Sequence, residues 1–325
     1  MMTIVYASDK NYAALTSISA VSALRHNPGA QIVLLGYNLE VDAREIVRSR
    51  VEKSGGVFEY HDVSKTIEHL KTDGCSGYTS YAAYARIFAA DVMPDRHGRI
   101  LYLDCDTLVN GSLDPLFEMD MKGCPLALGF DCIPQAYNKF IGNSARLPYF
   151  NTGVMLISLD AWREHACRDR ILADLMDRKW PNPLADQDVI VRCFSGETVP
   201  LSPRWNFLSQ FFLVSYDAWH AIVGSGLDLP CSANEYVKAR NDAAIYHFSG
   251  HTLGRPWYTS SRHPMREEYR RAAAAADLAD VAEQTRSMLF DYKVQYWLYR
   301  LLPQKCFDVV CRWLYRINIW RNYHV

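Results

Sequence analysis

The sequence predicts an α/β protein with a mixed, mostly parallel sheet that carries helices on both faces, followed by a helical C-terminal appendage. Two observations predict this architecture. Short β-rich runs alternate with helical stretches through the first hundred residues, and Gly or Pro stands in the connections. After Pro256 the character changes to a polar helix, and then to a segment rich in arginine and aromatic residues.

The elements of the N-terminal third alternate regularly. Apolar runs predict strands at 3–7, 31–36, 56–63 and 99–103, and helical patterns lie at 11–27, 41–53 and 79–92. Pro28 and Gly29 close the first helix, and Pro94 stops the third. Such strand–helix–strand units are typical of a parallel sheet.

The elements after residue 120 follow less regularly. We expect strands at 125–131, 153–159 and 243–248, and helices at 161–179, 186–194 and 265–289. We divide the chain into a catalytic main domain, residues 1–260, and a helical C-terminal region, residues 261–325.

Composition narrows the class of protein. The chain has 325 residues with a net charge of -1, whereas a nucleic-acid-binding protein would be broadly basic. The N-terminus lacks a signal-peptide pattern, and no apolar run approaches the roughly 18–20 residues that span a bilayer. The nine cysteines are scattered and form no CxxC pair, which is typical of reduced thiols. We therefore expect a cytoplasmic protein.

Two aspartates separated by one residue follow the strand predicted at 99–103, in the stretch LYLDCDTLV. Ligands of open α/β sheets bind at the carboxyl ends of strands. On an extended backbone Asp104 and Asp106 point to one face, so both carboxylates can reach one cation. Hard oxygen ligands favour Mg²⁺ or Mn²⁺, which usually also bind substrate phosphates. The spacing therefore suggests a metal that bridges the protein to a diphosphate.

The same aspartates allow two other interpretations. Aspartate is common in solvated turns at strand ends, where it caps the next element. Haloacid-dehalogenase-type phosphatases also carry two aspartates at this spacing after a strand. Their motif opens the chain, and a Thr or Val follows one residue later. Here the motif lies a third of the way along the chain and Thr107 follows directly, which disfavours the phosphatase.

Several motifs in order resemble one family. They are YASDKNYA, YARI, LYLDCDTLVNGSLDPLF, YFNTGVMLI, DQDVI, RWNF, YHFSG and RPW, spread over residues 3–257. Together they resemble the retaining glycosyltransferases of family 8, particularly bacterial lipopolysaccharide galactosyl- and glucosyltransferases. The resemblance implies a Rossmann-like nucleotide-binding fold of the glycosyltransferase-A type. It also implies transfer of galactose or glucose from a UDP-hexose to an oligosaccharide or lipid-linked acceptor, such as lipopolysaccharide or lipooligosaccharide core.

The resemblance also implies roles for individual residues. The expected ligands of Mn²⁺, with Mg²⁺ as the alternative, are Asp104, Asp106 and His247. The residues expected to bind the donor are Asp9, Asn11, Arg86, Asp104, Cys105, Asp131, Asn151, Gly250 and Arg255. The residues expected to be catalytic are Asp186, Gln187 and Asp188.

The chemistry of these residues supports the roles and leaves alternatives. Two carboxylates and an imidazole suit Mn²⁺ better than Ca²⁺, although a lone histidine near a strand end is more often structural. A lone arginine on a helix, such as Arg86, is usually a surface ion-pairer. Asp186 could equally be a helix N-cap. Gln187 could orient or stabilise an oxocarbenium-like state, whereas Asp188 could form a covalent intermediate. The sequence leaves this choice open.

One position departs from the family pattern. The family usually carries a lysine before Pro-Trp, whereas this chain has Arg255, with longer spacing from Gly250. Arginine can clamp a phosphate bidentately where lysine acts as a point charge. We expect Arg255 to keep the charge while the geometry of the loop differs.

The C-terminal segment predicts contact with an anionic membrane surface. From Asp291 onward it holds six Lys and Arg residues against two Asp up to Arg321, with tryptophans and tyrosines between them. One face collects Phe307, Val310, Leu314 and Ile317, which is typical of an interfacial helix. The alternative is a helix packed on its own domain. With membrane contact, the protein would be peripheral on the inner face of the cell membrane.

Three functions follow for testing. The first is the metal-dependent hexosyltransferase. The second is a DxD phosphohydrolase, which would work without UDP. The third is a catalytically inactive relative, which would bind a sugar nucleotide without turnover.

Overall fold

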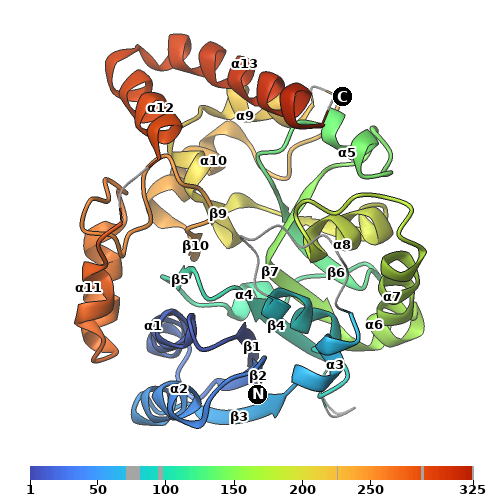
Figure 1. The fold of residues 1–325 in the computed structure, drawn as a ribbon, viewed down its shortest axis with the longest axis vertical. Coiled ribbons are helices and arrows are strands. Elements are labelled where there is room, and N and C mark those ends of the chain that lie inside the picture. Colours follow the sequence, from blue (N-terminus) through green and yellow to red (C-terminus); the bar gives the residue numbers. More distant parts are fainter. Residues whose placement is uncertain (71–80, 94–97, 225, 287–288, 324–325) are drawn as a thin grey trace.

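The computed structural model describes residues 1–70, 81–93, 98–224, 226–286 and 289–323 (Figure 1). A seven-stranded sheet in the order β3-β2-β1-β4-β7-β6-β8 forms the centre, and a smaller sheet has the order β5-β10-β9. The strands of the large sheet are β1 Thr3–Ser8, β2 Gln31–Gly36, β3 Val57–Asp62, β4 Arg99–Leu103, β6 Leu126–Phe130, β7 Phe150–Ser158 and β8 Thr198–Leu201. Those of the small sheet are β5 Thr107–Val109, β9 Phe207–Leu208 and β10 Ile245–His247.

The large sheet is mixed, as predicted. β1 runs parallel to β2 and β4, β2 to β3, and β6 to β8, whereas β7 is antiparallel to both β4 and β6. The longer helices of the main domain are α1 Ala13–His26, α2 Val41–Lys53, α6 Leu159–Glu164, α7 Cys167–Asp177, α8 Asp186–Phe194, α9 Tyr216–Val223 and α10 Ala233–Asp242. The shorter helices are α3 Ser64–Glu68, α4 Asp114–Phe117, α5 Ala136–Phe140 and the 3₁₀ segments Tyr81–Phe88, Pro203–Trp205 and Ser209–Phe212. The predicted fold class is confirmed.

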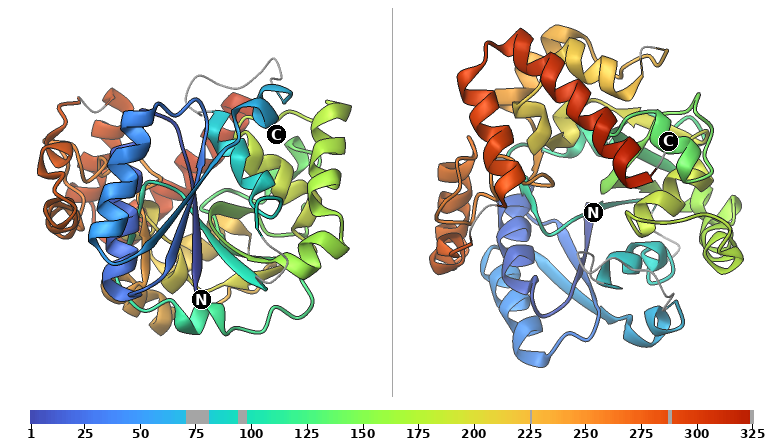
Figure 2. Two further views of the ribbon diagram at one scale, coloured as in Figure 1. Left: turned by 90° about the horizontal axis from the view of Figure 1, so that it is seen from below. Right: turned by 45° about the horizontal axis from the view of Figure 1, so that its top comes forward.

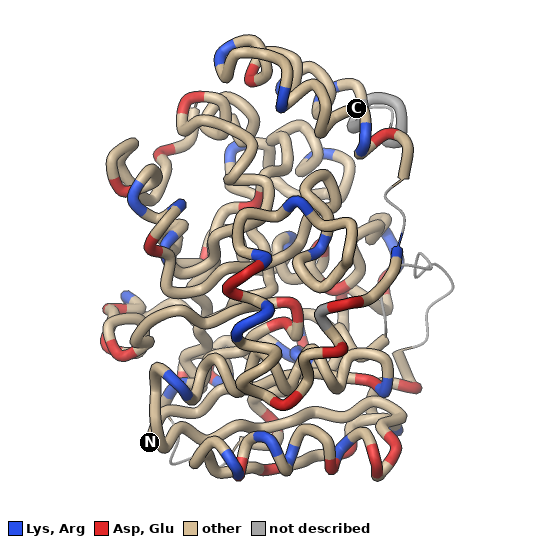
Figure 3. Tube along the Cα trace, turned by 90° about the vertical axis from the view of Figure 1, so that its left-hand side faces the viewer, with Lys and Arg blue, Asp and Glu red and all other residues tan. Residues whose placement is uncertain are grey.

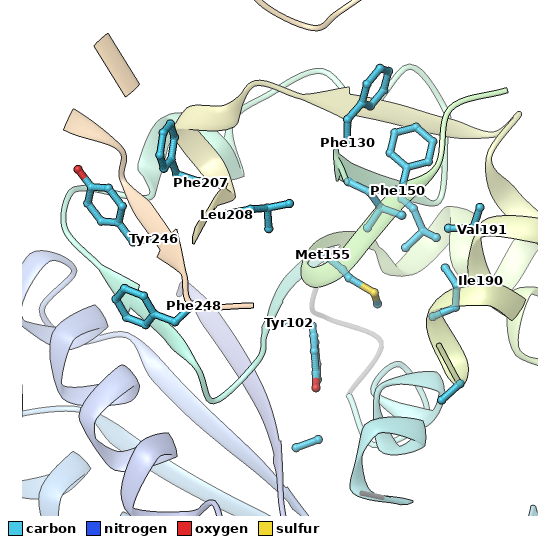
Figure 4. Packing of buried hydrophobic residues seen from close by; sticks show 14 of the residues in the cluster. Tyr102, Phe130, Phe150, Met155, Ile190, Val191, Phe207, Leu208, Tyr246 and Phe248 are labelled. Atoms are coloured by element: carbon cyan, nitrogen blue, oxygen red, sulfur yellow. The ribbon is translucent and has the colours of Figure 1, made fainter. Parts of the chain in front are cut away.

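Both faces of the sheet are covered by apolar layers. All six residues of β1 are buried, which explains why its sequence is continuously apolar instead of alternating. Val5 and Ala7 pack into one layer, and Ile4 and Tyr6 pack into the layer on the other face. The first layer continues through Phe150 and other side chains toward the small sheet (Figure 4). This continuity ties the two sheets together.

Three predicted helices were wrong in kind or extent. Within 79–92, residues 79–80 lie outside the described part, and Tyr81–Phe88 is a 3₁₀ helix. Its side chains from Tyr84 to Phe88 are all buried, so no single apolar face defines it. The helix expected at 161–179 is divided into α6 and α7 at Ala166, which is left-handed at φ 49°. The helix expected at 265–289 stops as α11 Arg266–Ala275, just before Asp277 at φ 54°.

The C-terminal region ends in two helices, α12 Phe290–Leu301 and α13 Gln304–Tyr323. In Figure 2, α13 crosses over α9 and ends near α5, and both helices contact it. Phe307 and Cys311 of α13 are buried, and the Asp308 carboxylate accepts the Ser215 backbone N–H at 3.2 Å. The sequence assigned Phe307 to a lipid-facing surface. That assignment was wrong, because this side packs on the main domain.

No helix in the described ranges is long and apolar enough to cross a membrane. Basic positions recur along α12 and α13 with few acidic ones between them (Figure 3).

Candidate functional site

Asp104 lies directly after β4 and is fixed by its neighbours. Its backbone N–H donates to the Gly153 carbonyl at 2.8 Å, and the Thr107 hydroxyl donates to the Asp104 carbonyl at 2.8 Å. The Tyr102 hydroxyl donates to Asp104 Oδ1 at 3.0 Å. This leaves Oδ2 to face His247, whose Nε2 lies 3.9 Å away.

The small sheet brings the third predicted ligand to the aspartates. β10 pairs with β5 so that His247 stands opposite Thr107, and the Phe248 N–H donates to the Asp106 carbonyl at 2.9 Å. His247 Nε2 lies 3.2 Å from Asp106 Oδ1. One ligand atom each from Asp104, Asp106 and His247 lies within 4.8 Å of the other two. The predicted metal triad is therefore assembled in space, and these are the residues that could hold a divalent ion.

A chain of amides orients His247. Asn151 Nδ2 donates to the Asp131 carboxylate at 3.0 Å, so Asn151 Oδ1 is left to accept from Asn206 Nδ2 at 2.9 Å. Asn206 Oδ1 therefore faces His247 Nδ1 at 3.1 Å and accepts its proton. In the neutral ring this fixes the tautomer with a lone pair on Nε2, on the side of Asp106. Outer partners of this kind set the orientation of metal-binding histidines.

Asn206 was not assigned a role from the sequence, although it lies in the RWNF motif. In the sequence, an asparagine between Trp205 and Phe207 was the only available signal, and it indicates no partner.

Gly153 lines the triad from β7. A Cβ at this position would lie 2.1 Å from His247 Cε1 and 2.7 Å from Asp104 Oδ2. The sequence gave no role to this glycine, because its function is to leave space beside residues distant in the chain.

The charges of the triad shift its proton affinities. Burial raises the pKa of Asp106, but His247 and Arg255 outweigh burial and hold that pKa well below its usual range. Burial lowers the pKa of His247, yet the charge and hydrogen bond of Asp106 leave it raised. Arg255 also forms an ion pair with Asp106 Oδ2 and stacks over Trp257, 5.5 Å from the ring centroid. Arg255 therefore lies beside the predicted metal site.

The Arg86 side chain is buried and pairs with both Asp104 and Asp186. The alternative that Arg86 forms an ion pair on the surface is therefore wrong. Arg86 Nη2 donates to Asp104 Oδ1 at 2.9 Å, and its Nε lies 2.8 Å from Asp186 Oδ2. Nη1 donates to the Thr152 carbonyl at 2.5 Å, and the guanidinium lies 4.6 Å from the centroid of the Tyr102 ring. Arg86 thus positions two predicted site residues, and its contact with a donor remains a prediction.

Asp186 begins α8 but does not cap it. The N-cap residue is Ala185, and no side chain makes a cap hydrogen bond there, so the capping alternative is wrong. Among the described residues, Asp186 Oδ2 is buried without a directed hydrogen bond, although Arg86 lies beside it. Burial raises the pKa of Asp186 to about 7, against the opposing charge of Arg86. Among the described residues, the Arg86 guanidinium is the partner of this oxygen.

The amide of Gln187 is held at both ends. Its Nε2 donates to Asp131 Oδ2 and to the Tyr149 hydroxyl, both at 3.2 Å. Its Oε1 accepts from Asn151 Nδ2 and from the Thr152 backbone N–H, also at 3.2 Å. The amide is therefore fixed beside Asp131 and Asn151, and contact of this group with a donor sugar remains a prediction.

Asp188 points away from this group. It is fully buried, and it accepts hydrogen bonds from the Tyr149 hydroxyl at 2.6 Å, the Tyr137 hydroxyl at 3.1 Å and the Leu184 N–H at 2.7 Å. Burial raises the pKa of Asp188 to about 6. With both oxygens occupied, Asp188 is suited to positioning Tyr149, which in turn contacts Gln187.

The remaining predicted donor residues follow β1, β4 and β10 in the chain. Asp9 and Asn11 follow β1, which pairs with β4, and Asp9 Oδ1 accepts the Asn11 N–H at 2.8 Å. Cys105 is half-buried between the aspartates, and burial raises the pKa of its thiol. A Cβ on Gly250 would meet the Gln210 side chain at 3.1 Å. Their contact with a donor remains a prediction.

Comparisons with known proteins show which family the chain resembles in sequence and in fold. Residues 3–260 match the sequence model of Glycosyl transferase family 8. The chain is 24% identical to General stress protein A of Bacillus subtilis over 275 residues, 83% of this chain and 92% of that protein. It is 22% identical to lipopolysaccharide 1,2-glucosyltransferase of Escherichia coli, over 91% of this chain and 84% of that one. A solved structure of galactosyltransferase LgtC in complex with donor and acceptor sugar analogs is similar at a TM-score of 0.68 and 25% identity, covering 84% of this chain and 96% of that chain.

Proposed function

Because this chain belongs to glycosyl transferase family 8 and is therefore a transferase, we propose that it moves galactose or glucose from a UDP-sugar to a saccharide acceptor with retention of configuration. The acceptor we propose is lipopolysaccharide or lipooligosaccharide core. Two similar proteins carry related names, a lipopolysaccharide glucosyltransferase and a galactosyltransferase.

The convergence of Asp104, Asp106 and His247 is the observation that carries this proposal. Two carboxylates and an imidazole whose Nε2 faces Asp106 fit Mn²⁺, with Mg²⁺ as the alternative. A bound ion would neutralise the UDP leaving group as a Lewis acid. The protein itself fixes the ligands: Asn206 orients His247, Tyr102 and Arg86 orient Asp104, and Gly153 leaves the space.

Residues next to the triad support binding of the transferred sugar. Asp131, Asn151 and Gln187 form one hydrogen-bonded group, and Asp186 precedes Gln187 at the start of α8. The enclosed Asp188 disfavours a covalent intermediate on that residue. We therefore favour departure of UDP and attack of the acceptor on the same face, with the fixed Gln187 amide beside the reacting carbon.

A donor screen tests the function. Purified protein is incubated with individual UDP-hexoses, with and without Mn²⁺, and release of UDP is measured. We expect release from one UDP-hexose only when metal is present. Binding of UDP without turnover would instead identify an inactive relative, and phosphate release from simple phosphate esters would identify the DxD phosphohydrolase.

Arg255→Ala is expected to raise the KM for the donor about tenfold or more, because a charge-assisted contact near the diphosphate is lost. KM is measured by UDP release against donor concentration. Arg168→Ala is the matched control, since Arg168 pairs with Asp91 on the surface. An unchanged KM would remove Arg255 from the donor site.

The C-terminal helices also support a peripheral position on the inner face of the cell membrane. Phe290, Val294, Trp297 and Leu301 of α12 are spaced along one helical face and are exposed by 77%, 42%, 53% and 74%. Lys293 and Arg300 lie on the same helix. Exposed apolar residues with basic neighbours are typical of helices that lie in the headgroup layer of anionic membranes.

Trp297→Ser combined with Leu301→Ser is expected to abolish flotation with vesicles that contain phosphatidylglycerol, while metal-dependent UDP release persists. Substitution is preferable to deletion of the helices, because deletion would also remove the buried Phe307. Met176→Ser with Val237→Ser is the control, since these residues are exposed on the main domain. Wild-type flotation by the α12 variant would contradict membrane contact through this face.

A further inference from the structure

A cavity that does not include the triad lies between α5, α9 and α13. Its volume is about 250 Å³, and its walls include Gln135, Gly224, Arg312, Tyr315 and Arg316. It opens next to the loop that leaves β6, where Asp131 stands. None of the roles derived above uses this cavity.

The cavity is positively charged. Arg312 and Arg316 are the charged residues among its lining residues. Within the described part of the chain, neither has an acidic group within the 4.0 Å of an ion pair or a side-chain hydrogen bond, whereas the buried Arg192 is bonded to Asp174. Two like charges four residues apart on a helix repel each other. An anion between them would remove that repulsion.

The lining of the cavity also contains a polar side chain, Gln135. Gln135 packs directly on Gly224, where a Cβ would come within 2.4 Å of Gln135 Oε1. Gly224 is in the left-handed region at φ 122°, which glycine tolerates. Tyr315 lines the cavity as well, and burial raises the pKa of its hydroxyl well above the usual value, with the charge of Asp131 among the smaller causes. The lining thus combines two arginines with the neutral polar residues Gln135 and Tyr315.

The position of the cavity relates it to the acceptor. Gln135 lies four positions after Asp131, so their Cα atoms are at most about 14 Å apart. Asp131 contacts Gln187, while the triad lies at the other end of the amide chain through Asn151 and Asn206. The cavity therefore lies near the Asp131 end of this hydrogen-bonded chain, and the charge of Asp131 also acts on Tyr315 in its lining.

We propose that this cavity binds a phosphate group carried by the acceptor saccharide, with Arg312 and Arg316 as its cationic ligands. This inference rests on the proposed glycosyl transfer. A phosphate monoester carries about 1.5 to 2 negative charges at neutral pH, which matches two guanidinium groups better than a single carboxylate does. Guanidinium groups also bind phosphate oxygens bidentately.

The test uses the full-length protein saturated with UDP and Mn²⁺, so that the donor site is filled. Calorimetry compares the affinities for glucose 6-phosphate and glucose. We expect wild type to prefer the phosphorylated sugar by about tenfold or more, and Arg312→Gln with Arg316→Gln to lose that preference. Lys293→Gln with Arg300→Gln removes the same amount of charge from α12. This double variant is expected to keep the preference for glucose 6-phosphate. Thermal unfolding checks that both double variants are folded.

Two outcomes would overturn the inference: equal affinity of wild type for the two sugars, or an unchanged preference in the Arg312/Arg316 double variant. A flotation experiment with vesicles distinguishes phosphate on lipid headgroups from phosphate on the acceptor. If the double variant loses flotation with phosphatidylglycerol vesicles while keeping the preference for glucose 6-phosphate, the arginines bind lipid headgroups and not the acceptor. Failure of glycosyl transfer itself would appear separately, as absence of metal-dependent UDP release from wild type.

Discussion

Gly153→Ala is expected to abolish the metal site without removing any ligand. The new methyl group would occupy the space 2.1 Å from His247 Cε1 and 2.7 Å from Asp104 Oδ2, so the two ligands must move apart. Displacement of outer partners alone typically costs ten- to hundredfold in metal affinity. Displacement of the ligands themselves should cost about a hundredfold or more, both in Mn²⁺ affinity by titration and in metal-dependent UDP release.

Gly111→Ala is the matched control for this variant. A Cβ there meets its nearest atoms in Ala244 at 3.7 Å, an ordinary contact. Gly153 has no left-handed φ, so alanine should disturb the site by volume and not by backbone strain. Wild-type affinity for Mn²⁺ in Gly153→Ala would show that the ion does not bind between His247 and Asp104.

Arg86→Ala is expected to combine loss of activity with loss of stability. Removal of the guanidinium leaves the carboxylates of Asp104 and Asp186 without their buried counter-charge. Breaking such a buried pair typically costs about 3–5 kcal/mol. The free energy of unfolding is measured by urea denaturation, and activity by UDP release. Arg86→Lys should restore little of the activity or stability that Arg86→Ala loses, because one ammonium cannot reach Asp104, Asp186 and Thr152 together.

The instability of Arg86→Ala should depend on pH. The pKa of Asp186 is already raised to about 7, and loss of Arg86 raises it further. A carboxyl with a raised pKa in the folded state favours folding below its unfolded pKa, and this benefit is lost as pH rises through the folded pKa. The deficit relative to wild type should therefore be smaller at pH 5 than at pH 8. An equal deficit at both values would contradict the assigned role of the Arg86–Asp186 pair.

The sequence predicted the strands that carry the site because they are buried on both faces. β1 and β4 are continuous apolar runs, and polar side chains appear directly where each run ends. The position of Asp104 and Asp106 followed from the end of β4. Their meeting with His247 followed from the family resemblance and not from spacing.

The structures that orient the ligands could not be predicted in this way. β5 and β9 have three and two residues, too few to show a period, yet with β10 they place His247 beside Asp106. The roles of Asn206 and Gly153 depend on contacts between segments far apart in the chain. A single sequence carries no signal for such contacts.

The C-terminal helices show a related limit. Helical spacing correctly grouped apolar residues of α13, but a helix that packs on its own domain and one that lies on a membrane have the same pattern. Phe307 belongs to the first case, whereas Trp297 and Leu301 of α12 are exposed. The two kinds of helix are distinguished by the burial of their apolar side chains, which the sequence does not contain.

The central claim is that one divalent ion joins Asp104, Asp106 and His247 to the diphosphate of a sugar nucleotide. Calorimetric titration of UDP into the purified protein, before and after exhaustive chelation, tests this claim most directly. We expect UDP to bind in the presence of Mn²⁺ and to lose about a hundredfold or more in affinity after chelation. Equal affinity under both conditions would contradict the account.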